Sequence, residues 1–163
     1  MKMEKIPSFT IDHSVLDRGV YVSRIDSVGS EKVTTFDIRM KRPNREPPLE
    51  PETQHTLEHL AATYLRNNKS FADQVLYWGP MGCLTGSYLI VKSEQSPEDV
   101  IPYLIDMFNF IMNAEEVPGT KPEECGNCTL HDLVHAKYEA AKFLTEVLLS
   151  ENTPTKYPSS NEG

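Results

Sequence analysis

The strongest chemical signal in this sequence is the segment His55-Thr56-Leu57-Glu58-His59. On a helix, two histidines four residues apart lie about 40° apart on one face, close enough to share a metal ion. Glu58 would project about 60° to the other side of His55, within reach of the outer sphere of that ion. In zinc hydrolases with this H-x-x-E-H order, the glutamate acts as a general base. An amphipathic helix with solvated histidines has the same spacing, so the motif alone leaves both interpretations open.

The cysteines could complete such a metal site, because two histidines leave a divalent ion short of ligands. Cys125-Gly126-Asn127-Cys128 has C-x-x-C spacing, which also occurs in redox pairs and in halves of zinc ribbons. No second C-x-x-C is present to complete a ribbon. One of these thiolates, together with His55 and His59, would make a His₂Cys site with an open fourth position, as in catalytic zinc centres.

Three further residues have ambiguous roles at this level. Cys83 lies in a glycine-flanked turn, where an exposed thiolate could transfer protons, although a free cysteine is also commonly a small buried hydrophobe. His131 and His135 repeat the four-residue spacing without an intervening glutamate. For this second pair we favour solvated histidines.

The elements that must position these residues alternate between strands and helices without a strict βαβ rhythm. Residues 20–25 and 33–40 read as a hairpin whose second strand turns Arg39 away from the core. A proline-rich stretch then precedes a helix expected from about Thr53. The remaining expected elements are short strands at 75–78 and 88–91 and helices from 97 to 111 and from about 130 to 149. The pattern predicts one α+β domain over residues 1–163, an antiparallel sheet packed with helices, with a flexible tail at 152–163.

Composition narrows the classes of function. The chain has 163 residues, 39% of them hydrophobic, and a formal net charge of −8. This charge argues against nucleic acid or an anionic membrane surface as the main partner. The first residues contain no apolar stretch of the kind a signal peptide needs, and no run approaches a membrane span. With only three cysteines, we expect reduced thiols and a cytoplasmic protein.

Taken in order, five segments resemble the S-ribosylhomocysteine lyase (LuxS) family over roughly residues 6 to 148. They are Ser8-Phe9-Thr10-Ile11-Asp12-His13, Phe36-Asp37-Ile38-Arg39, His55-Thr56-Leu57-Glu58-His59-Leu60, Pro80-Met81-Gly82-Cys83-Leu84-Thr85-Gly86, and Cys125-Gly126 followed by His131-Asp132-Leu133. The number and order of these segments make chance similarity very improbable.

This resemblance implies a homodimer with active sites at the subunit interface and one divalent metal per subunit, Fe²⁺ with Zn²⁺ or Co²⁺ able to substitute. It implies His55, His59 and Cys125 as metal ligands, while Cys128 receives no role. Cys83 and Glu58 correspond to the family's acid/base residues. Ser8, His13 and Arg39 correspond to groups that contact the ribose or the reacting hydroxyls, and we expect the charge of Arg39 to favour the Cys83 thiolate.

The implied reaction cleaves the thioether of S-ribosylhomocysteine into homocysteine and 4,5-dihydroxy-2,3-pentanedione, the autoinducer-2 precursor, by carbonyl migration and β-elimination. Two other interpretations of the same residues remain. An H-x-x-E-H metallopeptidase would use an acidic third ligand well downstream and would need neither Cys83 nor Cys125. A non-enzymatic zinc module would bind its metal through both Cys125 and Cys128, in a closed shell.

Overall fold

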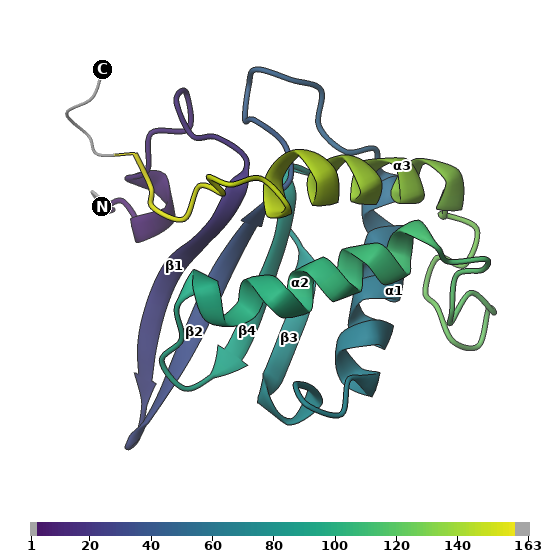
Figure 1. Ribbon diagram of the computed structural model, residues 1–163, viewed down its shortest axis with the longest axis horizontal. Coiled ribbons are helices and arrows are strands. Elements are labelled where there is room, and N and C mark those ends of the chain that lie inside the picture. The colour runs from purple at the N-terminus through teal and green to yellow at the C-terminus, as the bar shows by residue number, and fades with distance from the viewer. Residues whose placement is uncertain (1–2, 159–163) are drawn as a thin grey trace.

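The computed structural model describes residues 3–158, which form a four-stranded antiparallel sheet with three α-helices on one side (Figure 1). The strands are β1 (Gly19–Val28), β2 (Glu31–Arg39), β3 (Val75–Pro80) and β4 (Gly86–Lys92), in the order β1-β2-β4-β3. The helices are α1 (Pro51–Asn67), α2 (Pro97–Met112) and α3 (Leu133–Phe143), with short turns at Pro7–Phe9 and Ala72–Gln74 and a π-helical turn at Leu144–Leu148. The predicted α+β class is confirmed.

Strand β2 lies inside the sheet and pairs with β1 on one side and β4 on the other. Because side chains alternate across a strand, Phe36 and Ile38 point into the core, whereas Asp37 and Arg39 point to the opposite face. We call this opposite face, which the helices do not cover, the outer face. The predicted orientation of Arg39 away from the core is confirmed.

The helix boundaries follow local capping rules. Helix α1 begins at Pro51, two residues before the predicted start, because proline fits the first helical position. Helix α2 starts as predicted, with Ser96 and Asp99 forming a capping box. Helix α3 begins at Leu133 rather than near residue 130, because the Asp132 side chain accepts a hydrogen bond from the His135 amide and so acts as the N-cap.

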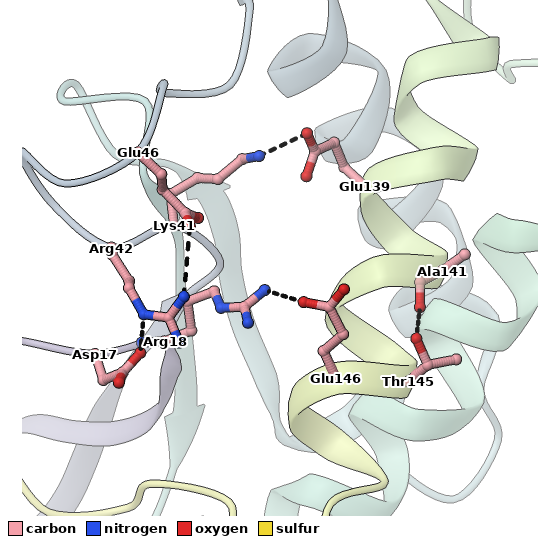
Figure 2. Close-up of polar contacts among 9 residues, drawn as sticks. All are labelled: Asp17, Arg18, Lys41, Arg42, Glu46, Glu139, Ala141, Thr145 and Glu146. Carbon is pink, nitrogen blue, oxygen red and sulfur yellow. Dashed lines mark hydrogen bonds and ion pairs between the residues drawn. The ribbon is translucent and has the colours of Figure 1, made fainter.

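The core lies between the inner face of the sheet and the helices. Phe36, Ile38 and Leu89 of the sheet are fully buried there. The helices contribute a larger set of buried apolar residues, including Leu57, Leu60, Met107, Phe108 and Phe143. Two ion pairs attach the last helical segment to the sheet side: Arg18 to Glu146 at 2.7 Å and Lys41 to Glu139 at 2.6 Å (Figure 2). Among residues 3–158, no helix combines the length and the apolar character needed to cross a membrane.

The C-terminal segment returns to the sheet. The Val20 amide donates to the Pro154 carbonyl at 2.9 Å, and the Tyr157 ring stacks on Tyr21. In Figure 1 this yellow segment runs beside one end of β1. We call residues 152–158 the C-terminal strap, because this part of the predicted flexible tail contacts β1, while residues 159–163 lie outside the described part of the chain.

Candidate active site

Four side chains that could bind a metal converge beside helix α1. His55 and His59 come from α1, Cys125 from the loop that follows α2, and His131 from the residues just before α3. Their ligand atoms all lie within 4.8 Å of one another. The Cys125 Sγ atom is 3.5 Å from His55 Nε2, 3.8 Å from His59 Nε2 and 4.0 Å from His131 Nε2. The structure therefore brings together the three predicted ligands and adds a fourth group.

Backbone carbonyls accept hydrogen bonds from one ring nitrogen of each α1 histidine. His55 Nδ1 lies 2.7 Å from the Leu130 carbonyl oxygen, and His59 Nδ1 lies 2.8 Å from that of Pro118. A carbonyl only accepts hydrogen bonds, so each Nδ1 carries a proton, and in the neutral imidazole each Nε2 then presents a lone pair to the cluster. The loop comes close to His59 at Gly119, which has a φ of +69°. Metal-binding histidines are held in this way, by a hydrogen bond from the outer ring nitrogen.

His131 is held in the same tautomer, through Thr56. The Thr56 hydroxyl donates its single proton to the Glu52 carbonyl at 2.8 Å and accepts from the Asp132 amide at 2.9 Å. Its contact with His131 Nδ1, at 3.2 Å, must therefore be a hydrogen bond that the imidazole donates. Burial lowers the pKa of His131, and the neighbouring His55 and His59 lower it further. A neutral His131 thus also turns an Nε2 lone pair towards Cys125.

The prediction that His131 and His135 are both solvated is wrong for His131. Its position next to His55, with ring centroids 4.1 Å apart, is created by the loop before α3 and not by its spacing from His135. Sequence spacing contained no sign of this, because Thr56 and the 130–132 segment are far apart along the chain. His135 is exposed and pairs with Asp132 at the start of α3, in accordance with the prediction.

A divalent transition metal fits this cluster. In a tetrahedral zinc site with bonds of about 2.0–2.1 Å to nitrogen and about 2.3 Å to sulfur, adjacent ligand atoms would be about 3.6 Å apart. The three sulfur–nitrogen distances lie within half an ångström of that value. The converging nitrogen and sulfur atoms are the ligand types that such a cation binds. Within residues 3–158, neither Cys128 nor any carboxylate belongs to the cluster.

Glu58 lies on α1 immediately before His59 and is half-buried. Its carboxylate is not one of the four clustered ligand groups. Among residues 3–158, no hydrogen bond or ion pair of the structure engages it. Its place on the helix therefore agrees with a role beside the ion rather than on it, which remains a prediction.

A second group of residues lies on the outer face. We call it the Arg39 group, and it consists of Asp37, Arg39, Cys83 and Thr85. Asp37 and Arg39 are buried and form a two-pronged ion pair, with Nε–Oδ1 at 3.0 Å and Nη2–Oδ2 at 2.6 Å. The remaining Arg39 nitrogen, Nη1, lies 2.6 Å from Thr85 Oγ1 and 3.8 Å from Cys83 Sγ. Burial acts to lower the pKa of Arg39, but the charge and hydrogen bonds of Asp37 outweigh it and raise the pKa.

Cys83 is exposed at the turn between β3 and β4, and its sulfur also lies 3.0 Å from Thr85 Oγ1. The structure therefore brings Cys83 and Arg39 together, as the charge argument expects. The pairing of Arg39 with Asp37 was not predicted, although their i, i+2 spacing on one strand places both on the same face. Within residues 3–158, no hydrogen bond joins this group to the His/Cys cluster.

The two other predicted substrate contacts lie near the amino terminus. Ser8 lines a pocket of about 410 Å³ on the outer face, beside Arg24, Tyr77 and Tyr88. His13 lies in the loop before β1, where its Nδ1 is 2.9 Å from the Ile11 carbonyl oxygen. In the described part of the chain, neither residue makes a hydrogen bond to the cluster or to Cys83.

Comparison of the sequence with known proteins assigns this chain to a family. The model of the family described as S-ribosylhomocysteinase (LuxS) matches residues 6–154. An S-ribosylhomocysteine lyase of Porphyromonas gingivalis strain W83 is 58% identical over 147 residues, which cover 90% of this chain and 92% of the relative. The lyase of Phocaeicola vulgatus is 59% identical over 90% of this chain and 91% of its own length, and that of Desulfotalea psychrophila 50% over 96% and 100%. With a match of this extent, and with a His/Cys cluster that fits a metal, the chain belongs to the LuxS family.

Proposed function

We propose that this protein is a metal-dependent S-ribosylhomocysteine lyase, which releases homocysteine and 4,5-dihydroxy-2,3-pentanedione. The observation that carries the proposal is the convergence of His55, His59 and Cys125 around one centre, in a chain of the LuxS family. The relatives named above are S-ribosylhomocysteine lyases, so the substrate follows from the family and the chemistry from the site.

In this proposal, His55, His59 and Cys125 hold the ion and leave its fourth position open to the substrate, and His131 lies beside this set. The ion is Fe²⁺, which Zn²⁺ or Co²⁺ could replace, because histidine and cysteine ligands suit all three metals. When bound, it supplies Lewis acidity that polarises carbonyl and hydroxyl oxygens. The carbonyls of Leu130 and Pro118 hold the imidazoles ready, so the ligand set needs little rearrangement to receive the ion.

The roles of Cys83 and Glu58 follow from what the substrate requires. A thioether that is not β to a carbonyl cannot leave as a thiolate, so the carbonyl must first move along the ribose from C1 to C3. Each shift removes a proton from one carbon and returns one to the next. We propose that Cys83 and Glu58 carry these protons on the two faces of the sugar, and that Glu58 assists the final β-elimination. Arg39, 3.8 Å from the Cys83 sulfur, would favour the thiolate that this role needs.

A homodimer with active sites at its interface would complete the arrangement. The Arg39 group and the pocket beside Ser8 both lie on the outer face. On this face Tyr77 is 49% exposed, and Tyr88 and Ile90 are half-buried. A second copy packed on this face could bring the His/Cys cluster of one chain to the thiol of the other, with Ser8, His13 and Arg39 contacting the ribose. The three free cysteines suit the reducing cytoplasm that we propose as its location.

The alternatives are less well supported. A metallopeptidase would need an acidic third ligand, and a closed zinc module would need Cys128 in the cluster. The cluster within residues 3–158 contains neither. The relatives named above also carry lyase names and not peptidase names.

The test supplies S-ribosylhomocysteine to ferrous-loaded protein under anaerobic conditions and follows thiol release with a chromogenic disulfide. We expect one thiol per substrate consumed. Glu58→Gln keeps the shape of the side chain but removes its basicity, so it should retain the metal and lose most turnover. Absence of thiol release from fully metal-loaded wild-type protein would reject the proposed lyase activity. Normal turnover by Glu58→Gln would show that Glu58 is not the general base.

A further inference from the structure

The C-terminal strap runs along the edge of β1, and its Tyr157 reaches the outer face next to the Arg39 group. The Pro154 carbonyl accepts from the Val20 amide, and the Thr153 hydroxyl donates to the Val147 carbonyl at 2.8 Å. Gly19 permits this close approach, because a Cβ at that position would lie 2.3 Å from the Pro154 carbonyl oxygen. These contacts fix the direction in which the strap continues to Tyr157. Tyr157 lies beyond residues 6–154, which the family model matches.

Tyr157 connects the strap to the buried ion pair. Its ring stacks on Tyr21 with centroids 4.8 Å apart and planes inclined by 14°. Its hydroxyl donates to Asp37 Oδ2 at 2.9 Å. Burial, the charge of Asp37 and the hydrogen bond to Asp37 all raise the pKa of Tyr157, so the hydroxyl keeps its proton and remains a donor. The same Asp37 oxygen also accepts from Arg39 Nη2.

An unbroken series of contacts thus runs from Tyr157 through Asp37 and Arg39 to Cys83. We propose that Tyr157 is a positioning residue, which acts through Asp37 and Arg39 to increase the reactivity of the Cys83 thiol. The catalytic meaning of this inference rests on the proposed function, since that function assigns Cys83 its role.

Two physical effects support this direction. A hydrogen bond donated to Asp37 draws negative charge from the carboxylate, so less of the positive charge of Arg39 is cancelled at the sulfur. The hydroxyl also holds Asp37 in place, and the two-pronged pair then fixes the guanidinium with Nη1 directed towards Thr85 and Cys83. Without Tyr157, Arg39 would face a more strongly charged and less constrained partner.

The charged and titratable groups around the sulfur are few in the described structure. Arg39 of β2 and Tyr88 of β4 are close enough to interact with it, and Asp37, Tyr21 and Arg24 lie around these two groups on the same side. Of these, only Asp37 touches both Tyr157 and Arg39. The hydrogen-bonded route from Tyr157 to Cys83 in the described structure therefore runs through Asp37 and Arg39.

The experiment measures alkylation of Cys83 by iodoacetamide as a function of pH, in full-length metal-loaded protein, with labelling followed on the Cys83 peptide by mass spectrometry. We expect Tyr157→Phe, which keeps the stack on Tyr21 but loses the donor, to move the midpoint of the profile to higher pH. The rate at neutral pH should fall about threefold, the size expected for one weakened charge interaction. A chain ending at Asn152 lacks both the Tyr157 hydroxyl and the ring that stacks on Tyr21. It should show a larger change in the same direction.

Tyr21→Phe is the matched control, because it alters the other ring of the same stack and removes a hydroxyl that donates to the Asp17 carbonyl instead. Its profile should match the wild type. A wild-type profile in Tyr157→Phe, with an unchanged unfolding midpoint, would overturn the inference, as would an equal shift in Tyr21→Phe. Alkylation does not depend on turnover. A shifted profile without lyase activity would therefore reject the proposed function and leave this inference intact, and the reverse result would reject only the inference.

Discussion

The His/Cys cluster and the Arg39 group differ in how their polar atoms are satisfied. In the cluster, three imidazoles direct lone pairs towards one point, and the described chain offers no cation there. Around Arg39, each charge already has a partner in the same chain, since Asp37 accepts both Arg39 and Tyr157. The first region is built to receive a charge from outside, whereas the second holds an internal charge in place. Substitutions should therefore affect metal content in the first region and stability or thiol reactivity in the second.

The largest loss of metal should come from Cys125→Ala. Loss of the thiolate removes the one anionic ligand of the cluster, so we expect metal content to fall below about a tenth of the wild-type value. Elemental analysis after dialysis measures this. Cys128→Ala is the matched control, because Cys128 lies outside the cluster and should keep its full metal content. The opposite pattern would show that Cys128 is the ligand.

Cys83→Ala should separate chemistry from metal binding. The sulfur lies by Arg39 and Thr85 and outside the cluster, so the variant should keep its metal and its fold. Turnover should fall by about 10²–10⁴-fold, the usual contribution of a proton-transfer group. Thiol release and metal analysis on the same preparation test both parts. Substantial turnover by this variant would remove Cys83 from the mechanism.

Asp37→Asn should reduce stability far more than a comparable change at the surface. It leaves the buried Arg39 without a counter-charge, which costs about 3–5 kcal/mol when one member of a buried pair is removed. Asp26→Asn breaks the exposed pair with Arg24 and should cost about 1 kcal/mol or less. Urea unfolding compares the two variants. Equal losses in the free energy of unfolding would show that burial does not increase the contribution of the Asp37–Arg39 pair to stability.

The smallest effect should distinguish His131 from His135. His131→Gln removes one lone pair from a cluster that keeps His55, His59 and Cys125, so we expect metal affinity to fall by about 10–100-fold. His135 is exposed on α3 and lies outside the cluster, so His135→Gln should bind metal as the wild type does. Competition with a chromogenic chelator measures both affinities. Equal affinities in the two variants would exclude His131 from the metal site.

Local patterns predicted most of the fold, because each element carries its own signal. The alternation in β2 predicted that Arg39 turns away from the core, and Ser96 and Pro97 predicted the start of α2. Predictions were poorer where distant residues decide the outcome. The C-terminal strap depends on the Pro154 carbonyl, which reaches the distant Val20 amide, whereas the start of α3, set by the adjacent Asp132 cap, was missed although its cause is local. The contact between Pro154 and Val20 leaves no periodic pattern in the sequence.

For the site, the sequence alone determined that His55 and His59 share one side of a helix, because a spacing of four residues is only slightly more than one turn. The order and the residues of the five motifs then indicated the family. Only the tertiary structure decided that His131 joins the cluster, that all three imidazoles turn the same nitrogen inward, and that Tyr157 reaches Asp37. The reason is physical: helical geometry follows from neighbours along the chain, whereas tautomers and ion-pair partners depend on carbonyls, hydroxyls and carboxylates that folding brings from far away.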